Sequence, residues 1–440
     1  MNSKSEYCLL LTACLLIYTT LVHGQDPILK TLSVNELFSL VIENNPSLSV
    51  SKANINIAKQ QVVVAKNDRL PDFNISVNAM YIGDVTLLDP DFSNSTNVDM
   101  PHFGNIFSVE ASQLIWKGSI VNNSIQAKSL QKEIAELNYL SNEQNIKLLA
   151  LGYYLDLYKL QNQADVYRLN IELAEQRLKN SNRFYKEGMV TRNNVIRSEL
   201  QISNLTLTLQ VVTNNIQILN KQLIVSLGLP ETTQIIAYET MLNENLKISI
   251  LEDYQNNITN HPTVVSTKKA VELYGISQKI TKAEQMPALV AFAGNTMQRP
   301  IITTTPAIDL YSNSWNVGLS LNFDIGSLYK THKKIRLNNY EIEKAKAQAN
   351  EVKQMIGVAV NAAYIKYNEA VSQNITLKKN KDLATENYRI TESKYNNQLA
   401  ILLDMIDASN TKLSTELQYT NSNINIIFAY YKLLKESGNL

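Results

Sequence analysis

Residues 315–326 read WNVGLSLNFDIG, and apolar and polar side chains alternate along them until the glycine at position 326. A period of two is typical of a β-strand with one apolar and one polar face. No proline follows Pro306, and proline is the residue that most strongly breaks helix interiors. The stretch therefore predicts a strand followed directly by a very long helix.

The same order of elements occurs twice along the chain. Pro46 and Pro262 are each followed, 25 residues on, by a second proline at positions 71 and 287. In both copies a helix-like run precedes the second proline, two alternating runs follow it, and the second run closes on Gly118 or Gly326. Such self-similarity indicates an internal duplication. The predicted organisation is a signal peptide at residues 1–24, a first repeat at 25–230, a linker at 231–247 and a second repeat at 248–440.

The N-terminus has the features of a secretory signal peptide. Lys4 precedes an apolar run from Cys8 to Tyr18, and cleavage is expected before Gln25. The run is too short for a transmembrane anchor. Residues 11–14 also resemble a bacterial lipoprotein box, which would make Cys14 a lipidated N-terminus, although the residues after it continue the apolar run.

Composition narrows the classes of protein that remain. Both cysteines lie in the predicted signal, so the exported chain must be held together by packing or by assembly. The net charge is +1 and charges of both signs are interspersed, which predicts no nucleic-acid partner. No other apolar run approaches the roughly 18 residues of a membrane helix, so any membrane insertion must use strands.

Four alternating runs are predicted to form strands. Strands of roughly 9–11 residues with an apolar outer face and a polar inner face suit an outer-membrane barrel, and they also suit a half-buried sheet of a soluble domain. Four strands do not close a barrel, and unpaired edges are not tolerated in lipid, so a membrane position would require several chains to share one barrel. The runs are Phe73–Tyr81, Phe107–Ile115 with an interruption at Gln113 and Leu114, a weaker Leu289–Ala293, and Trp315–Phe323.

Two runs of about 70 residues, Ser119–Glu187 and Tyr329–Asn397, contain no proline. At 1.5 Å per residue each would be a helix of roughly 100 Å. Each is followed by a shorter helix with apolar residues at alternating steps of three and four, which indicates coiled-coil-like antiparallel hairpins. In the first shorter helix the stripe is Ile202, Leu205, Leu209, Val212, Ile216, Leu219 and Leu223.

Three short motifs occur in a fixed order along the chain, and that order points to a particular protein family. They are QLIWKG at residues 113–118, YKEGMVT at 185–191 and LGLP at 227–230. With the repeated hairpins, they make the chain similar to the TolC-type outer-membrane efflux protein family (outer membrane factors). The resemblance implies a mainly α fold with membrane β-strands, in which a homotrimer builds a twelve-stranded β-barrel and long helices build a periplasmic α-barrel.

The resemblance also implies a function. The chain would be a passive export duct of a tripartite efflux or type I secretion system, with a periplasmic adaptor protein, an inner-membrane transporter and outer-membrane lipid as partners. It would be neither an enzyme nor a cofactor protein, and the scattered histidines support no metal cluster. The alternative is a periplasmic or surface coiled-coil structural protein without channel activity.

The turns between long and short helices are expected to be the functional tips. In the first repeat the turn falls at Glu187 and Gly188, and in the second at Asn397 and Gln398, where the family usually has glycine. These four residues are expected to contact the adaptor. Because a left-handed residue is strained without glycine, Gln398 suggests a second turn with different backbone demands.

Just beyond the second turn, Asp404 and Asp407 stand three residues apart and so share a helix face. The resemblance implies that they form carboxylate rings at the periplasmic mouth, which would favour cations. The other interpretation is that they are first-turn acids favoured by the helix dipole.

The resemblance places further gate residues around the two turns. Tyr395 matches a gating tyrosine, and Asn194 replaces the usual aspartate of the first repeat. Ala400 stands where the family has a basic residue, so the family's salt-bridge lock is in doubt, and Arg192 is the candidate substitute cation.

Overall fold

The computed structural model describes residues 28–237, 246 and 248–440. The predicted signal peptide, Cys14 and most of the predicted linker lie outside the described residues. Two compact units divide the chain. Among described residues, the helical unit comprises 28–49, 142–258 and 356–440, and the sheet unit comprises 50–141 and 259–355.

Eight α-helices are described in the structure, together with one 3-10 turn at Ile258–Asn260. The helices are α2 (Val34–Asn44), α3 (Pro46–Asn67), α4 (Ile120–Lys186), α5 (Arg192–Leu227), α6 (Leu251–Asn257), α7 (Pro262–Ala283), α8 (Ser327–Asn396) and α9 (Leu402–Glu436). The strands are β1 (Ile28–Thr31), β2 (Asp72–Tyr81), β3 (Val85–Leu88), β4 (Ser95–Val98), β5 (Phe103–Trp116), β6 (Thr233–Ile236), β7 (Ala288–Arg299) and β8 (Ser312–Asn322).

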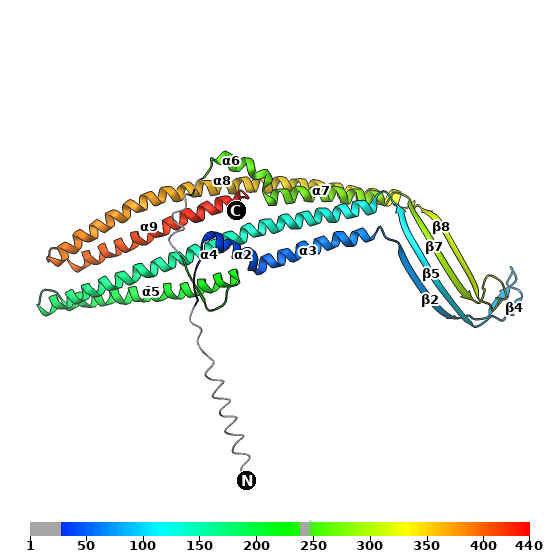
Figure 1. The fold of residues 1–440 in the computed structure, drawn as a ribbon, viewed down its shortest axis with the longest axis horizontal. Helices are drawn as coiled ribbons and strands as arrows, with labels where there is room; N and C mark the ends of the chain where they lie inside the picture. Colours follow the sequence, from blue (N-terminus) through cyan, green and yellow to red (C-terminus); the bar gives the residue numbers. More distant parts are fainter. Residues whose placement is uncertain (1–27, 238–245, 247) are drawn as a thin grey trace, which may run out of the picture. The chain divides into compact units, whose positions relative to one another are not determined.

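A four-stranded antiparallel sheet in the order β2-β5-β7-β8 dominates the sheet unit (Figure 1). Pro71 and Pro287 lie directly before β2 and β7, where each preceding helix has ended. The four predicted strands are therefore confirmed. β7 has 12 residues, well beyond the weak run expected from the sequence, because its outer half pairs with neighbours on both sides despite its polar sequence.

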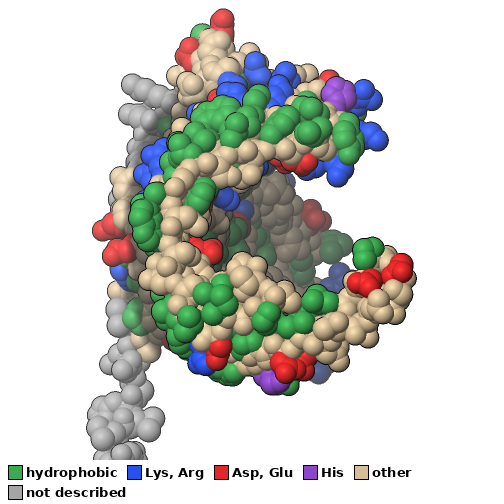
Figure 2. Space-filling view, turned by 90° about the vertical axis from the view of Figure 1, so that its right-hand side faces the viewer, with side chains coloured by type: hydrophobic (Ala, Val, Ile, Leu, Met, Phe, Trp, Pro, Cys, Tyr) green, Lys and Arg blue, Asp and Glu red, His purple; other side chains and the backbone are tan. Residues whose placement is uncertain are grey.

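The strand register gives the sheet one apolar and one polar face. Val317 lies opposite Ala293, which lies opposite Ala111, which lies opposite Phe73. The adjacent row on the other face contains Asn316, Gly294, Glu110 and Asn74. Figure 2 shows the strands end-on, with hydrophobic side chains along the outside of their curve. The exposed members of the apolar face are Phe73, Ile75, Val77, Tyr81, Phe103, Phe107, Val109, Trp116, Met297, Trp315, Val317, Leu319 and Leu321.

The interruption at Gln113 and Leu114 has a structural counterpart in β5. The pairing with β7 shifts between Leu114 and Trp116, so one extra residue, Ile115, bulges from the ladder. A bulge of this kind restores the side-chain alternation in a new phase and increases the local twist.

The long connection between β2 and β5 contains its own small hairpin, β3–β4, with Val85 opposite Val98. The four alternating runs recognised in the sequence did not include these two strands. Thr86 and Asn97 share a hydrogen bond across the pair, so polar side chains rather than an apolar pattern support it.

The two long helices match the predicted runs to within two residues at each end. Within the helical unit, each is followed by its shorter partner, so α4–α5 and α8–α9 form two antiparallel hairpins (Figure 1). The predicted stripe of α5 faces inward: Leu205, Val212 and Leu223 are buried. The predicted coiled-coil-like packing is therefore confirmed.

A second, smaller group of elements lies in the helical unit. β1 pairs in parallel with β6. Helix α2 begins with a capping box in which Ser33 and Glu36 satisfy each other's backbone N–H groups. The buried Tyr154 hydroxyl donates to the carbonyl of Leu32 at 2.7 Å and ties α4 to this group. Among the described helices, none combines the length and the apolar character needed to cross a membrane.

Candidate functional site

The two hairpin turns have the same backbone geometry. Gly188 has a φ of +75° and Gln398 a φ of +62°, both in the left-handed region. The amide of Gly188 donates to the carbonyl of Tyr185 at 3.0 Å, and that of Gln398 donates to the carbonyl of Tyr395 at 3.0 Å. In both turns the next amide, of Met189 or Leu399, reaches back five residues. Each long helix therefore ends in a Schellman motif.

The expectation that Gln398 changes the turn is wrong. The second turn closes with the same hydrogen bonds as the first, so the backbone demand is unchanged and only the residue differs. A non-glycine residue in this region costs roughly 1–2 kcal/mol. Gln398 recovers part of that cost through its side chain, whose Nε2 donates to Sδ of Met189 at 3.5 Å and so connects the two turns.

This geometry predicts opposite effects for two glycine replacements. Gly188→Ala should lower the free energy of unfolding by about 1 kcal/mol, because the cost comes from the left-handed backbone. A Cβ at this position would meet no atom within 4 Å. Gly275 lies in the interior of α7, and a Cβ there would also meet no atom within 4 Å. Gly275→Ala should therefore raise the free energy of unfolding by about 1 kcal/mol. Denaturant midpoints of the helical circular dichroism signal measure both, and shifts of the same sign would contradict the backbone explanation.

Tyr395, the predicted gating tyrosine, is buried directly before the second turn. It packs in an apolar cluster with Phe184, Tyr388, Leu402 and Met405. Its hydroxyl is 3.2 Å from the Oγ of Ser181 on α4, a hydrogen bond between the two hairpins. Tyr395 therefore anchors α8 to α4 in this structure.

A second tyrosine contact between the hairpins was missed by the sequence interpretation. The guanidinium of Arg177 on α4 is buried, and its Nη1 donates to the hydroxyl of Tyr388 at 3.4 Å. That hydroxyl donates in turn to Oε1 of Glu392 at 2.8 Å. Burial, assisted by the hydrogen bond to Glu392, raises the pKa of Tyr388 to about 12, so it stays protonated.

Arg177 carries a desolvation cost that the described residues offset only partly. Its Nε and Nη2 have no acceptor among them. A buried cation without a carboxylate partner is unfavourable. The signal that could have revealed this contact is spacing: Tyr388 and Tyr395 are seven residues apart on α8, and Arg177 and Ser181 are four apart on α4. Each pair therefore lies on one helix face.

Asp404 and Asp407 are both exposed in the first two turns of α9. Oδ2 of Asp404 accepts the backbone N–H of Ile401 at 3.3 Å. Among the described residues neither aspartate forms an ion pair. Asp404 therefore serves the helix start, as the second interpretation expected, whereas Asp407 lies beyond the cap and has no such role.

Arg192 and Asn194 lie in the first turn of α5. Arg192 is exposed and has no ion pair with a described carboxylate, so the structure does not bring it to Asp404 or Asp407 within one chain. Asn194 is half-buried and lines a cleft of about 390 Å³ between the two turns. Both turns contribute to this cleft, which is lined by Phe184, Met189, Val190, Thr191, Asn194, Tyr395, Gln398, Ala400, Ile401 and Leu402.

The predicted adaptor-contact residues are the outermost part of each turn. Glu187, Gly188, Asn397 and Gln398 are all exposed. The Nδ2 of Asn397 donates to the carbonyl of Ser393 at 2.8 Å, and Glu187 forms no ion pair with a described residue. The tips therefore present mixed polar side chains and one exposed Met189.

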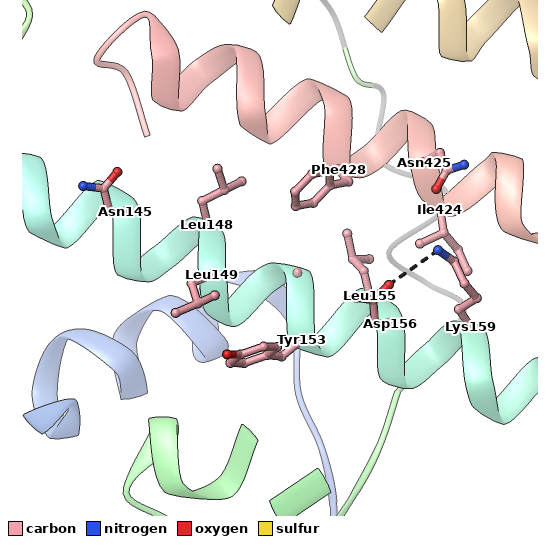
Figure 3. A pocket seen from close by; sticks show the side chains of 11 residues that line it. Asn145, Leu148, Leu149, Tyr153, Leu155, Asp156, Lys159, Ile424, Asn425 and Phe428 are labelled. Atoms are coloured by element: carbon pink, nitrogen blue, oxygen red, sulfur yellow. Dashed lines mark hydrogen bonds and ion pairs between the residues drawn. The ribbon is translucent and has the colours of Figure 1, made fainter. Parts of the chain in front are cut away.

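A groove in the helical unit is mostly apolar (Figure 3). It lies between α4 and α9, where Gly152 leaves Phe428 room to approach. Its polar groups are an Asp156–Lys159 ion pair of 3.4 Å at one end and two asparagines. No group of three potential metal ligands occurs in the described part of the chain.

A comparison with known families supports the resemblance. Residues 254–435 match the family model described as outer membrane efflux protein. This part of the chain is similar to the outer membrane efflux protein family. The resemblance to TolC-type channels is thereby confirmed, and the exact bounds of the two predicted repeats stay a prediction.

Relatives of this efflux family share the length of the chain. The outer membrane efflux protein BepC of Brucella suis biovar 1 (strain 1330) is 21% identical over 435 residues, which cover 98% of this chain and 90% of BepC. The CusC channel structure has a TM-score of 0.78 at 12% identity, over 92% of both chains. The outer membrane protein VceC of Vibrio cholerae has a TM-score of 0.74 at 14% identity, over 92% of this chain and 96% of VceC.

Proposed function

We propose that the chain is one protomer of a homotrimeric export duct in a bacterial outer membrane. The observation that carries the proposal is the sheet with one apolar face, whose outermost strands β2 and β8 are unpaired along their outer edges. Lipid does not tolerate open strand edges. Three chains that each contribute four strands would pair β2 of one protomer with β8 of the next and close a twelve-stranded barrel.

The polar face would then line a water-filled channel. Ser76 and Ser108 are hydrogen-bonded to each other on this face at 2.7 Å, and Glu110 lies on the same side. Polar interiors and apolar exteriors are the pattern of outer-membrane channels. The name of BepC, an outer membrane efflux protein, agrees with this assignment.

The hairpins would form a periplasmic tunnel that ends at the two turns. Each repeat, 25–230 and 248–440, would supply one hairpin, joined by the linker at 231–247. An adaptor protein would bind the tips at Glu187, Gly188, Asn397 and Gln398, and an inner-membrane transporter would supply the substrate and the energy. The exposed, polar character of the tips supports this role.

The constricted end of the duct would lie at the second turn. Asp404 and Asp407, exposed and without ion-pair partners among the described residues, would form carboxylate rings around the threefold axis. Tyr395 would hold α8 against α4 in the closed state, and Asn194 would face the cleft between the turns. Arg192, exposed in the first turn of α5, would be the substitute cation of the gate. Asp407 supports the ring interpretation more strongly than Asp404, which also has a capping role.

Reconstitution tests the proposed function. The full chain should require detergent for release from outer-membrane vesicles, run as a cross-linked trimer and give single-channel currents in a planar bilayer. A chain that washes off with salt and carries no current would instead be the coiled-coil structural protein.

A further inference from the structure

The start of α8 carries an unusual concentration of positive charge. Lys330, Lys333, Lys334 and Arg336 occur within its first ten residues, and the first turn contains no acidic residue. The N-terminal end of a helix already has a partial positive charge, so cations there are unfavourable unless an anion compensates them.

Among the residues that the structure describes, only one of these cations has a carboxylate partner. Lys334 forms an ion pair of 2.7 Å with Glu284 at the end of α7. Among the described residues, no carboxylate lies within ion-pair distance of Lys330, Lys333 or Arg336, and all three side chains are exposed. Lys330 approaches only the ring of Tyr329, at 6.0 Å from its centroid. Three cations therefore remain available to an external anion.

These cations directly follow the apolar face of the sheet. The last strand, β8, ends at Asn322, and Ile325, Leu328 and Tyr329 continue its exposed apolar surface. Lys333 is about 9 Å along the helix from Ser327. The headgroup layer of a bilayer is roughly 5–8 Å thick on each side, so flexible basic side chains at this distance reach it.

Two of the three cations, Lys333 and Arg336, also share a face with aromatic side chains. Tyr329, Lys333, Arg336 and Tyr340 lie at i, i+4, i+7 and i+11, on the side of α8 opposite the buried Thr331. Tyrosine next to basic residues is typical of a membrane–water interface.

The first repeat shows that the junction itself does not need the charges at Lys330 and Lys333. Counted from Gly118 as the second repeat is counted from Gly326, the residues equivalent to Lys330 and Lys333 are Asn122 and Ile125, whereas the equivalent of Arg336 is Lys128. Both repeats nevertheless make the same passage from strand to long helix. The charges at Lys330 and Lys333 are therefore an added feature of the second repeat, and the charge at Arg336 is common to both repeats.

We propose that Lys330, Lys333 and Arg336 bind the phosphate groups of anionic phospholipids in the leaflet that faces the periplasm. The proposal rests on the proposed membrane position of the strands. Each cation near an anionic surface is worth about fivefold in association, so three give a strong preference for anionic over zwitterionic lipid. Chain continuity with the lipid-facing strand selects a lipid as the source of the phosphate.

The test measures lipid preference at the protein surface. The full chain is reconstituted in phosphatidylcholine vesicles, and electron spin resonance compares spin-labelled phosphatidylglycerol with spin-labelled phosphatidylcholine. The wild type should prefer phosphatidylglycerol by about fivefold or more. The triple variant K330Q/K333Q/R336Q should lose that preference, while its channel current confirms that it has inserted and folded.

A matched control separates the site from net charge. The variant K344Q/K346Q/K353Q removes three exposed cations further along the same helix and should keep the preference. Equal lipid association in the wild type, an unchanged preference in the first variant or a loss in the control would overturn the proposal. Displacement of the labelled lipid by inorganic phosphate, at matched ionic strength with chloride, would overturn it as well. Absence of current in the wild type would instead contradict the proposed function.

Discussion

Leu319→Arg is expected to prevent assembly of a conducting channel. Leu319 lies on the apolar face of β8, is 70% exposed in the single chain, and pairs with Ala291 in the adjacent strand. A charged residue on the lipid-facing side of a barrel strand costs about 2–4 kcal/mol near the middle of the bilayer. A homotrimer would incur that cost three times, so loss of the trimer band and of the planar-bilayer current should follow.

The neighbouring residue provides the control. Ser320 is next in β8 and lies on the polar face, so Ser320→Arg adds the same charge to the water-filled side. This variant should assemble and conduct, with an altered ion preference at most. Equal loss of assembly in both variants would contradict the assignment of the two sheet faces.

The double variant Asp404→Asn/Asp407→Asn is expected to abolish cation selectivity. Six carboxylates around a narrow mouth would attract cations and repel anions, and the amides remove all six charges. Asparagine retains the side-chain oxygen that accepts the amide of Ile401, so the start of α9 should stay intact. The reversal potential across a salt gradient should move to the value for a permeability ratio of about one.

A second exposed pair of acids serves as a control. It distinguishes an effect of carboxylate rings at the mouth from an effect of the total charge of the chain. Glu172 and Glu175 also stand three residues apart on α4, at a distance from the turns and without described ion pairs. Their replacement by glutamine should leave the reversal potential nearly unchanged. An equal shift in both double variants, or no shift in the aspartate variant, would assign Asp404 and Asp407 to helix capping alone.

The large elements were predictable because their determinants are local. The proline-free runs define α4 and α8, and strict alternation defines β2 and β8. β7 was underestimated because its outer half is largely polar and depends on pairing with both neighbours. Asn295 is polar although it lies on the apolar face, opposite Val109 and Trp315, and Gln298 lies on the polar face near the strand end. The β3–β4 hairpin had no apolar alternation to indicate it.

The site was predicted less completely than the fold. Tyr395 and the turn positions could be located from the sequence, but the conformation at Gln398 could not, because the hydrogen bonds of the turn outweigh the preference of one residue. The contact of Arg177 with Tyr388 depends on how two hairpins pack, with 211 residues between the partners. Periodicity identifies a buried face and does not identify its partner.

The pairing of β5 with β7 has a consequence for the order of folding. β2 and β5 are adjacent in sequence apart from the β3–β4 hairpin, whereas Asn105 of β5 pairs with Arg299, more than 190 residues later. Closing the longer loop costs roughly 2 kcal/mol more than closing the shorter one. β5 cannot pair with β7 until the second repeat has left the export machinery. Until then the pair β2–β5 has exposed strand edges. During that interval the chain is most exposed to aggregation, and it is the stage at which a periplasmic chaperone would have the largest effect on yield.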